Sequence, residues 1–422
     1  MSVPTVTREL PAHPESPARA LVCRECASEY PLTAAHVCEM CFGPLEVGYD
    51  KSVLARVTRA SIEAGPQNMW RYAGLLPSGH NPAERVSLGA GMTKLVRADR
   101  LAAELGMSSL WVKDDSGNPT HSFKDRVVSV ALSAARSLGY TTVACASTGN
   151  LAHSVAAHAA SAGLRSVVFI PNDLEDGKTV STAVYGGTLV AVEGSYDDVN
   201  RLCAEVASDE PWAFVNVNLR PYYAEGSKTL GYEVAEQLGW RLPEQVVVPI
   251  ASGSLLTKVD KAFREFTELG LVERCSYKIF GAQATGCSPV SKAYAEGWEV
   301  PQPVRPSTIA KSLAIGNPAD GVYALEVVRR TGGAIADVTD DEIVEGMRLL
   351  ARTEGVFAET AGGVTVATLI KLLESGALDR NAETVVLNTG DGLKTLDPLI
   401  GVAKPTVTLK PTLENFRAAG IA

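Results

Sequence analysis

Short runs of β-branched and apolar residues alternate with segments of helical periodicity from Ser109 onward, and brief polar stretches separate them. The clearest such runs are Thr141–Cys145, Ser166–Ile170, Thr188–Val192, Gln245–Val248 and Thr384–Leu387. Short runs that are apolar on both faces are typical of strands in the interior of a parallel sheet. Each run therefore predicts a buried strand.

Helix signals lie between these runs. Thr339 and Glu342 have the spacing of a capping box, and Ile343, Met347 and Leu350 follow at helical intervals. The alternation of strands and helices predicts an α/β fold with layered parallel or mixed sheets and right-handed crossovers. In such sheets ligands bind beyond the carboxyl ends of strands, so the loops that directly follow strands are the places to look for chemistry.

Composition and charge narrow the class of protein. The 422 residues are 46% hydrophobic and 21% charged, which is typical of a globular chain with more than one core. No run approaches the roughly 20 apolar residues that span a bilayer, and the first residues lack the apolar centre of a secretory signal. We therefore expect a cytoplasmic protein without a membrane partner. A net charge of -9 opposes binding to a phosphate backbone, so we expect no nucleic-acid partner.

Four cysteines near the N-terminus form two C-x-x-C pairs, Cys23 with Cys26 and Cys38 with Cys41. Each pair can supply two thiolates from one tight turn, and the intervening segment can return as a hairpin to complete a tetrahedral zinc site. Two disulfides are the alternative, which the expected cytoplasmic location disfavours. Because sulfur would fill all four ligand positions, we expect a structural zinc ion in a ribbon-like module.

The first candidate loop, Asn118–Arg126, follows the strand-like Leu110–Val112 and opens an apolar helix. Lys124 therefore lies near the positive end of a helix dipole, which disfavours the ammonium form and keeps an amine available for covalent chemistry. A lysine at the start of a helix is otherwise an ordinary solvated surface residue.

The second loop, Ser147-Thr148-Gly149-Asn150, could hold a carboxylate on its backbone N–H groups, with the Asn150 amide near a ring oxygen. Its alternative is a plain helix N-cap.

Two more loops follow strands later in the chain. Ala251-Ser252-Gly253-Ser254-Leu255 resembles a phosphate cradle, because small side chains let the backbone approach an anion at the start of a helix. It lacks the P-loop lysine and the full G-x-G-x-x-G pattern, so it does not specify a nucleotide. In Asn388–Lys394, Thr389 could offer its hydroxyl to a ring nitrogen, and a tight turn without a ligand is the alternative.

Taken together and in this order, these loops resemble those of the fold-type II family of enzymes that use pyridoxal phosphate (PLP). The resemblance implies a two-lobed α/β fold similar to the tryptophan synthase β subunit, with PLP as the cofactor. It also implies a role for each loop: Lys124 carries PLP, Ser147, Thr148 and Gly149 receive the substrate carboxylate, Asn150 approaches the PLP hydroxyl, Ala251–Leu255 bind the PLP phosphate and Thr389 faces the pyridine nitrogen.

Leu88–Leu95 and Ser312–Pro318 resemble segments of the threonine synthases, many of which also carry an N-terminal cysteine-rich ribbon. This resemblance implies conversion of O-phospho-L-homoserine and water into L-threonine and phosphate. His121, Val127 and Gly187-Thr188 depart from the family's pattern near the expected substrate phosphate. Cysteate synthase-like and threonine or serine dehydratase-like reactions therefore stay open.

The leaving phosphate is a dianion, and the residue that is often basic in threonine synthases is replaced at Gly187-Thr188. Another cation must therefore meet the phosphate. Arg126 and Lys311 are our candidates, with a surface charge or an ion pair between lobes as the alternative for each.

The resemblance divides the chain into a zinc-ribbon-like module (1–50), a larger PLP-binding lobe (51–124 and 211–400), a smaller α/β lobe (125–210) and a C-terminal tail (401–422). We expect a small amino-acid substrate as the partner. A homodimer is left open, because no feature of the sequence specifies the assembly.

Overall fold

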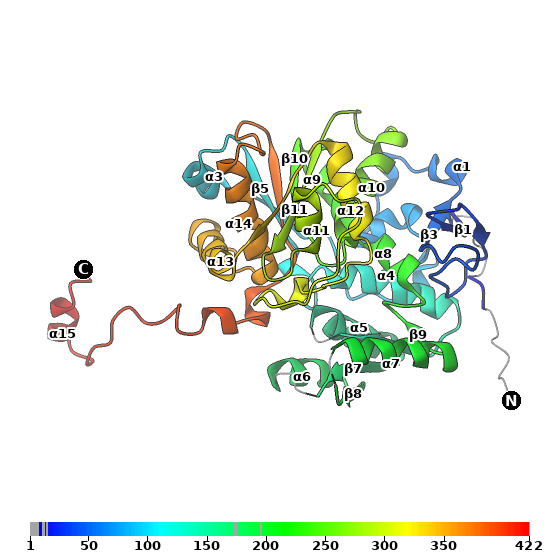
Figure 1. Ribbon diagram of the computed structural model, residues 1–422, viewed down its shortest axis with the longest axis horizontal. Coiled ribbons are helices and arrows are strands. Elements are labelled where there is room, and N and C mark those ends of the chain that lie inside the picture. The colour runs from blue at the N-terminus through cyan, green and yellow to red at the C-terminus, as the bar shows by residue number, and fades with distance from the viewer. Residues whose placement is uncertain are drawn as a thin grey trace.

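The computed structural model describes residues 8–10, 13, 16–147, 149–172, 176–194 and 196–421. Two α/β lobes form the body, a small β-module lies beside them near the N-terminus, and the C-terminal segment leads away from the body (Figure 1). The parallel and mixed sheets confirm the fold class that the sequence predicts.

The larger lobe is built on a six-stranded sheet with the order β12-β11-β10-β13-β5-β4. Its strands are β4 (Lys94–Arg97), β5 (Leu110–Asp114), β10 (Gln245–Pro249), β11 (Lys278–Ala284), β12 (Ile335–Val338) and β13 (Thr384–Asn388). Neighbouring strands run parallel, except that β4 pairs antiparallel with β5 at one edge. The helices of this lobe are α3 (Asp99–Leu105), α9 (Lys228–Gln237), α10 (Ser254–Glu268), α11 (Pro289–Ala295), α12 (Gly321–Thr331), α13 (Asp340–Glu354) and α14 (Thr360–Glu374).

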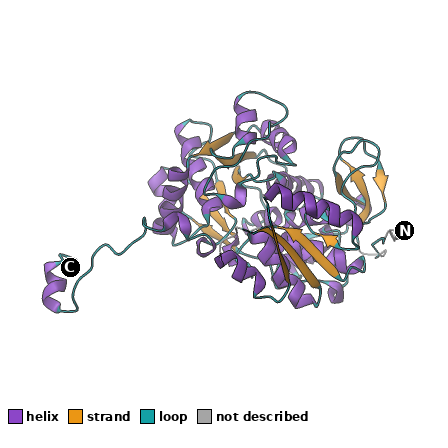
Figure 2. Cartoon of the chain, turned by 60° about the horizontal axis from the view of Figure 1, so that its bottom comes forward, coloured by secondary structure: helices purple, strands orange, loops and turns teal. Residues whose placement is uncertain are grey.

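The smaller lobe contains a four-stranded parallel sheet with the order β8-β7-β6-β9. Its strands are β6 (Thr142–Ala146), β7 (Arg165–Pro171), β8 (Thr188–Val192) and β9 (Ala213–Phe214). The turned view in Figure 2 shows helices flanking the strands of the molecule's sheets. Helices in this part of the chain are α4 (Lys124–Ser137), α5 (Asn150–Ala162), α6 (Asp176–Ala183), α7 (Tyr196–Asp209) and α8 (Arg220–Gly226).

Local sequence signals account for these elements. The run predicted at Thr188–Val192 is β8, and the other predicted strands overlap β6, β7, β10 and β13. The predicted capping box at the start of α13 is present, with the Thr339 and Glu342 side chains each bonded to the other's backbone N–H. Gly355, at φ 69°, ends that helix, because a glycine adopts the left-handed region without strain.

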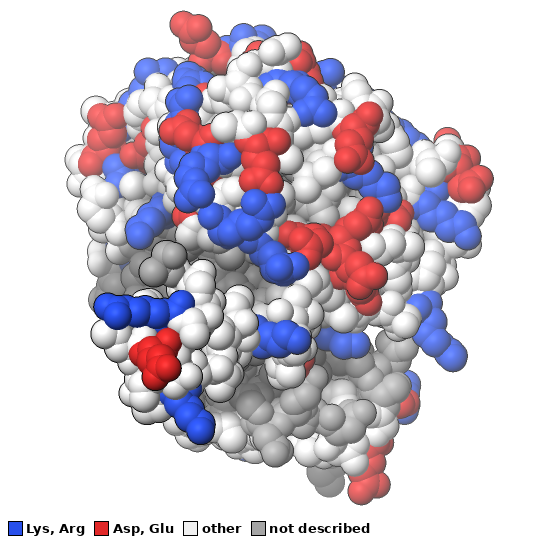
Figure 3. Space-filling model, turned by 90° about the vertical axis from the view of Figure 1, so that its left-hand side faces the viewer, with Lys and Arg blue, Asp and Glu red and all other residues white. Residues whose placement is uncertain are grey.

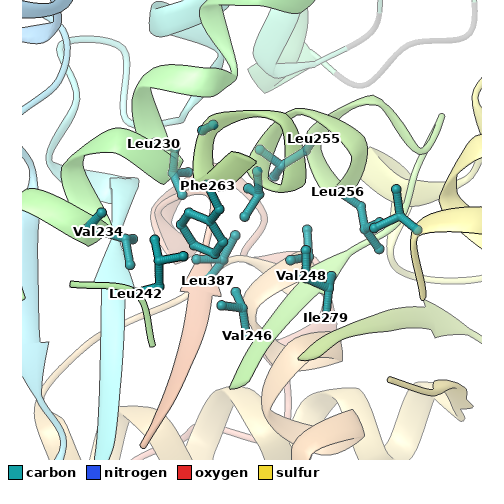
Figure 4. Packing of buried hydrophobic residues seen from close by; sticks show 14 of the residues in the cluster. Leu230, Val234, Leu242, Val246, Val248, Leu255, Leu256, Phe263, Ile279 and Leu387 are labelled. Carbon is teal, nitrogen blue, oxygen red and sulfur yellow. The ribbon is translucent and has the colours of Figure 1, made fainter. Parts of the chain in front are cut away.

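Buried apolar side chains join α9 and α10 to the large sheet. Figure 4 shows Leu230, Leu256 and Phe263 from these helices pointing toward Val246 and Val248 of β10. All five are fully buried. Burying a side chain of this size contributes about 1.5–3 kcal/mol, so this cluster holds α9 and α10 against the sheet.

The N-terminal module is a three-stranded antiparallel sheet of β1 (Ala18–Cys23), β2 (Glu29–Tyr30) and β3 (Leu45–Tyr49). It packs against α8 through β3, and the Tyr222 hydroxyl donates a 2.9 Å hydrogen bond to the Thr33 carbonyl. Two short helices, α1 (Lys51–Leu54) and α2 (Arg59–Glu63), then lead into the larger lobe. The module is therefore attached to the body by specific side-chain contacts.

The C-terminal segment ends in a short helix, α15 (Leu413–Ala418), that lies away from both lobes (Figure 1). In the part of the chain that the structure describes, no helix combines the length and apolar character needed to cross a bilayer. Lys and Arg side chains alternate with Asp and Glu side chains over the described part of the face in Figure 3.

Candidate active site

The candidate loops lie where parallel strands end. β10, β13 and β5 are neighbours in the large sheet and run in the same direction, so the loops that follow them emerge at one edge. The loop after β6 comes from the sheet of the smaller lobe. This arrangement is the usual place for a ligand in an open α/β sheet.

Lys124 is the first residue of α4, and its side chain is half-buried. Its Nζ donates a 2.8 Å hydrogen bond to the Tyr223 hydroxyl on α8 and lies 4.6 Å from the centre of the Phe123 ring. The amine therefore sits between two aromatic rings at the positive end of a helix, which is unlike the solvated surface lysine of the alternative interpretation.

Asp125 fixes the loop that presents Lys124. Its carboxylate is buried and accepts hydrogen bonds from the Thr120 backbone N–H and the Thr120 hydroxyl, both at 2.6 Å. It also accepts a 2.6 Å bond from the Ser154 hydroxyl on α5. One carboxylate thus ties the lysine loop to the helix that begins at Asn150.

Glu359 brings together residues from two of the loops. The Asn150 amide donates to both of its carboxylate oxygens, at 3.2 and 2.9 Å, and the Thr389 hydroxyl lies 3.5 Å from one of them. Burial raises the pKa of Glu359, and the Asn150 hydrogen bond and the charges of Lys394 and Lys124 oppose that rise. Asn150 and Thr389 therefore converge on one buried acidic group, whose pKa the charge of Lys124 also lowers.

The loop after β13 is joined to the lysine loop through backbone hydrogen bonds. The Phe123 N–H donates to the Thr389 carbonyl at 3.0 Å, and the Asp391 N–H donates to the His121 carbonyl at 3.1 Å. Gly390 lies between them, and a Cβ there would come within 2.5 Å of the Glu359 carboxylate. His121 has φ 62°, a left-handed conformation that costs a non-glycine residue roughly 1–2 kcal/mol.

The loop after β10 has the shape expected of an anion cradle. Gly253 has φ 94°, and a Cβ at this position would meet the Asp320 carbonyl oxygen at 2.6 Å, so a larger residue does not fit. Ser254 begins the 15-residue helix α10, and its N–H donates a 3.4 Å hydrogen bond to the Ser252 hydroxyl. The N–H groups of a helix's first turn have no partner within the helix, so they are suited to meet an anion. Leu255 is buried in the core, so it can offer its backbone but not its side chain.

The loop after β6 is described except for Thr148, which lies outside the described residues. The Ser147 hydroxyl accepts a 3.3 Å hydrogen bond from the Gly149 N–H, and Gly149 is the N-cap of α5. Near Lys124, the buried Ser122 hydroxyl has no hydrogen-bond partner among the described residues. An amine, an amide, hydroxyls and an anion cradle are the groups that a phosphorylated aromatic aldehyde requires.

A family model described as "Pyridoxal-phosphate dependent enzyme" matches residues 86–390. The chain belongs to this family. It is 36% identical over 402 residues to a threonine synthase of Methanosarcina acetivorans. This alignment covers 94% of this chain and 98% of that protein. It is 35% identical over 392 residues to a threonine synthase of Methanocaldococcus jannaschii, with 92% and 96% covered.

Solved structures of a deaminase and a racemase have the same fold. The processed form of threonine deaminase isoform 2 from Solanum lycopersicum superposes with a TM-score of 0.64 at 19% identity, covering 93% of this chain and 98% of that one. Maize serine racemase gives a TM-score of 0.62 at 22% identity, with 72% and 88% covered. The predicted fold-type II architecture is thus confirmed.

Arg126 has a different environment from the one we expected for a phosphate-binding residue of this family. Its side chain is fully buried and pairs with Asp115 at 2.7 Å and Glu233 at 2.5 Å. Its remaining N–H groups reach the hydroxyls of Thr93 and Thr229. Because these partners satisfy the guanidinium, Arg126 stabilises the lobe interior and is not available to a leaving phosphate.

Lys311 is exposed at the start of the short helix η4 (Lys311–Leu313). This helix packs against α14, whose N-cap is Glu359. The structure thus leaves Lys311 accessible and shows no contact between it and those other candidate residues that are described.

The four cysteines predicted to bind zinc form one cluster in the β-module. Cys23 and Cys41 Sγ are 3.4 Å apart, Cys26 and Cys38 Sγ 3.6 Å, and all four sulfurs lie within 4.8 Å of one another. A disulfide has a sulfur separation near 2.05 Å, so none is formed. Tetrahedral zinc with Zn–S bonds of about 2.3 Å places its sulfurs about 3.8 Å apart, which this cluster approximates.

Two groups in the site carry weaker sequence signals. Glu359 does not follow a strand and precedes the small residues that open α14, and Tyr223 lies within a short helix. The only sequence signal for Glu359 is an acidic residue among apolar and small ones between Phe357 and Gly363. Neither position can be assigned from spacing alone, because both contacts arise from segments far apart in the chain.

Proposed function

We propose that the protein is a threonine synthase, which converts O-phospho-L-homoserine and water into L-threonine and phosphate. The observation that carries the proposal is the convergence of Asn150 and Thr389 on Glu359, beside the loop that presents Lys124. It occurs in a chain whose relatives named threonine synthase align with it over nearly its whole length.

In this proposal Lys124 would hold PLP between turnovers. Once the amine of the amino-acid substrate has displaced it, the free Lys124 amine would move protons at the α and β carbons of the substrate. When bound, PLP supplies a store for the electrons freed at the α carbon. The Asn150 amide would meet the ring hydroxyl, and the Thr389 hydroxyl would meet the ring nitrogen. Because a neutral hydroxyl stabilises a protonated ring less than a carboxylate does, the site favours elimination and replacement.

The Ala251–Leu255 loop binds the PLP phosphate through backbone N–H groups at the start of α10. Ser147, Thr148 and Gly149 receive the substrate carboxylate at the start of α5. Lys311 is our remaining candidate for the leaving phosphate, since Arg126 is fully paired in the interior. Glu359 orients the Asn150 amide through two hydrogen bonds.

The cysteine cluster is proposed to hold one structural zinc ion through Cys23, Cys26, Cys38 and Cys41. Four sulfurs within 4.8 Å fill the tetrahedral positions and leave none for water, so the ion braces the module and takes no part in the reaction.

We also propose a homodimer. The C-terminal segment carries exposed apolar side chains that its own chain leaves uncovered, and these are Ile400, Leu413, Phe416 and Ile421. Light scattering should give twice the 44.5 kDa chain mass, and a monomer at micromolar concentration would contradict this proposal.

A substrate screen tests the activity. Purified protein loaded with PLP is incubated with O-phospho-L-homoserine, O-phosphoserine with sulfite, threonine and serine, and the released phosphate and products are measured. The proposal predicts equal amounts of phosphate and L-threonine from O-phospho-L-homoserine. If the protein did not convert O-phospho-L-homoserine, formation of cysteate from O-phosphoserine would indicate a cysteate synthase. Formation of 2-oxo acids from threonine or serine would in that case indicate a dehydratase.

A further inference from the structure

Arg24 lies between Cys23 and Cys26 and connects the cysteine cluster to the larger lobe. Its guanidinium carbon is 3.4 Å from the centre of the Tyr323 ring on α12. One of its nitrogens is 3.1 Å from the Glu46 carboxylate and 3.8 Å from that of Asp320. The side chain thus leaves the β-module and stacks on the body of the molecule.

Asp320 links this contact to the cradle at Ala251–Leu255. Its backbone N–H donates a 2.8 Å hydrogen bond to the Ser252 carbonyl, and its carbonyl oxygen lies where a Cβ on Gly253 would be, 2.6 Å away. The main chain of Asp320 is therefore one wall of the cradle.

Two arginines compensate the charge of Asp320. Arg220, at the start of α8, donates to one carboxylate oxygen at 2.8 Å, and Arg24 lies nearest the other. The Asp320 side chain is only 11% exposed, so solvent screens it weakly. An uncompensated carboxylate beside the cradle would repel a bound phosphate dianion.

A second contact joins the module to the same helix. Glu46 on β3 pairs at 2.8 Å with Lys258, which lies on α10 about one turn after the cradle. Lys258 also pairs at 2.9 Å with the buried Glu225 on α8. The module therefore contacts both the wall of the cradle and the helix that supplies its N–H groups.

We infer that Arg24 is a positioning residue for the cofactor's phosphate and that closure of the cysteine cluster controls it. Arg24 lies in the turn between two ligating cysteines, and its N–H donates to the Pro44 carbonyl at 3.1 Å, so closing the cluster fixes the direction of its side chain. Fixed in this way, Arg24 neutralises Asp320 and holds it against Ser252. The inference rests on the proposed assignment of Ala251–Leu255 to the PLP phosphate.

The test compares binding of PLP and of pyridoxal, which lacks the phosphate, to the cofactor-free protein by absorbance titration. Arg24→Gln should weaken PLP binding about threefold to tenfold, leave pyridoxal binding within about twofold and keep the zinc content of the wild type. Arg19→Gln is the matched control, because Arg19 pairs with Glu29 within the same module. It should bind both ligands as the wild type does.

Asp320→Asn supplies the second arm of the test. If Arg24 acts through Asp320, the effect of Arg24→Gln on PLP affinity should shrink to less than about twofold when Asp320 is already Asn. If the wild type bound PLP more tightly than pyridoxal and Arg24→Gln kept this difference unchanged, the role of Arg24 would be refuted. The assignment of the cradle to the phosphate would stand. Full additivity of the two substitutions would have the same consequence. A wild type that binds PLP and pyridoxal equally would refute the phosphate assignment of the cradle, and the inference with it.

Discussion

The Asn150 amide donates hydrogen bonds to both carboxylate oxygens of Glu359, at 3.2 and 2.9 Å. Asn150 begins a helix of the smaller lobe, whereas Glu359 directly precedes a helix of the larger lobe. The pair therefore joins the two lobes at the site and sets the direction in which the amide points.

The first prediction concerns this pair. Glu359→Ala removes the acceptor of Asn150, so turnover should fall about tenfold to a hundredfold, because small misplacements of a positioned group are costly. The absorbance band of the bound cofactor should shift as well. Glu359→Gln is the control, since its amide oxygen can still accept from Asn150, and it should retain the wild-type band and most of the turnover. An Ala variant with the wild-type band and rate would show that Glu359 does not orient the amide.

The second prediction concerns acid stability. Partial burial opposes ionisation of Glu46, but the charges of Lys258, Lys261 and Arg24 outweigh it and lower its pKa from 4.5 to about 2. Because the folded-state pKa is below the ordinary value, the stabilisation is complete above pH 4.5 and is lost as the pH falls toward 2. Denaturant unfolding at several pH values should show Glu46→Gln less stable by about 1–3 kcal/mol at pH 6, with the difference shrinking toward pH 2. Parallel stability curves would contradict the assignment.

The third prediction separates the two basic residues that were candidates for the leaving phosphate. Arg126→Ala leaves Asp115 and Glu233 buried without their partner, so the free energy of unfolding should fall by about 3–5 kcal/mol. Lys311→Ala should change stability by less than about 0.5 kcal/mol and instead raise the KM or lower the kcat for O-phospho-L-homoserine.

Lys51→Ala, at an exposed position on α1, is the control for Lys311 and should leave both kinetic constants unchanged. If Lys311→Ala also left both constants unchanged, the leaving phosphate would need another partner.

The fourth prediction is that the protein binds one equivalent of zinc through its cysteine cluster. Cys38 is fully buried, and Cys38→Ser should abolish zinc binding and lower the free energy of unfolding by about 2 kcal/mol or more. Cys275→Ser, outside the cluster and exposed, should change neither quantity. Metal analysis combined with thiol titration distinguishes a zinc site from two disulfides. Protein that contains no zinc and in which none of the four clustered cysteines titrates as a thiol would favour the disulfides.

Sequence alone was sufficient for the strands β6, β7, β8, β10 and β13 and for placing the candidate loops at strand ends. The runs at Thr188–Val192 and Gln245–Val248 are short and β-branched, and they correspond to strands of the two sheets. A pattern of this kind depends only on neighbouring residues, so it can be recognised without knowledge of the tertiary structure. The loops follow from it, because a ligand site in an open sheet lies at strand ends.

Partners distant in the chain could not be predicted in this way. The sequence places Arg126 two residues after Lys124, which made it a candidate for the leaving phosphate. Glu233, 107 residues later on α9, converts it into a buried ion pair. Glu359 was not identified for the same reason, because its contact with Asn150 spans 209 residues and neither residue signals the other.

The central proposal, that Lys124 holds PLP, is tested most directly by finding which lysine carries the cofactor. Borohydride reduction of the PLP-loaded protein, followed by proteolysis and mass spectrometry, locates the modified residue. We predict modification at Lys124, whose amine lies between Phe123 and Tyr223, and no fixed cofactor in Lys124→Ala. Modification at another lysine, such as the nearby Lys394, with Lys124 unmodified would contradict the account.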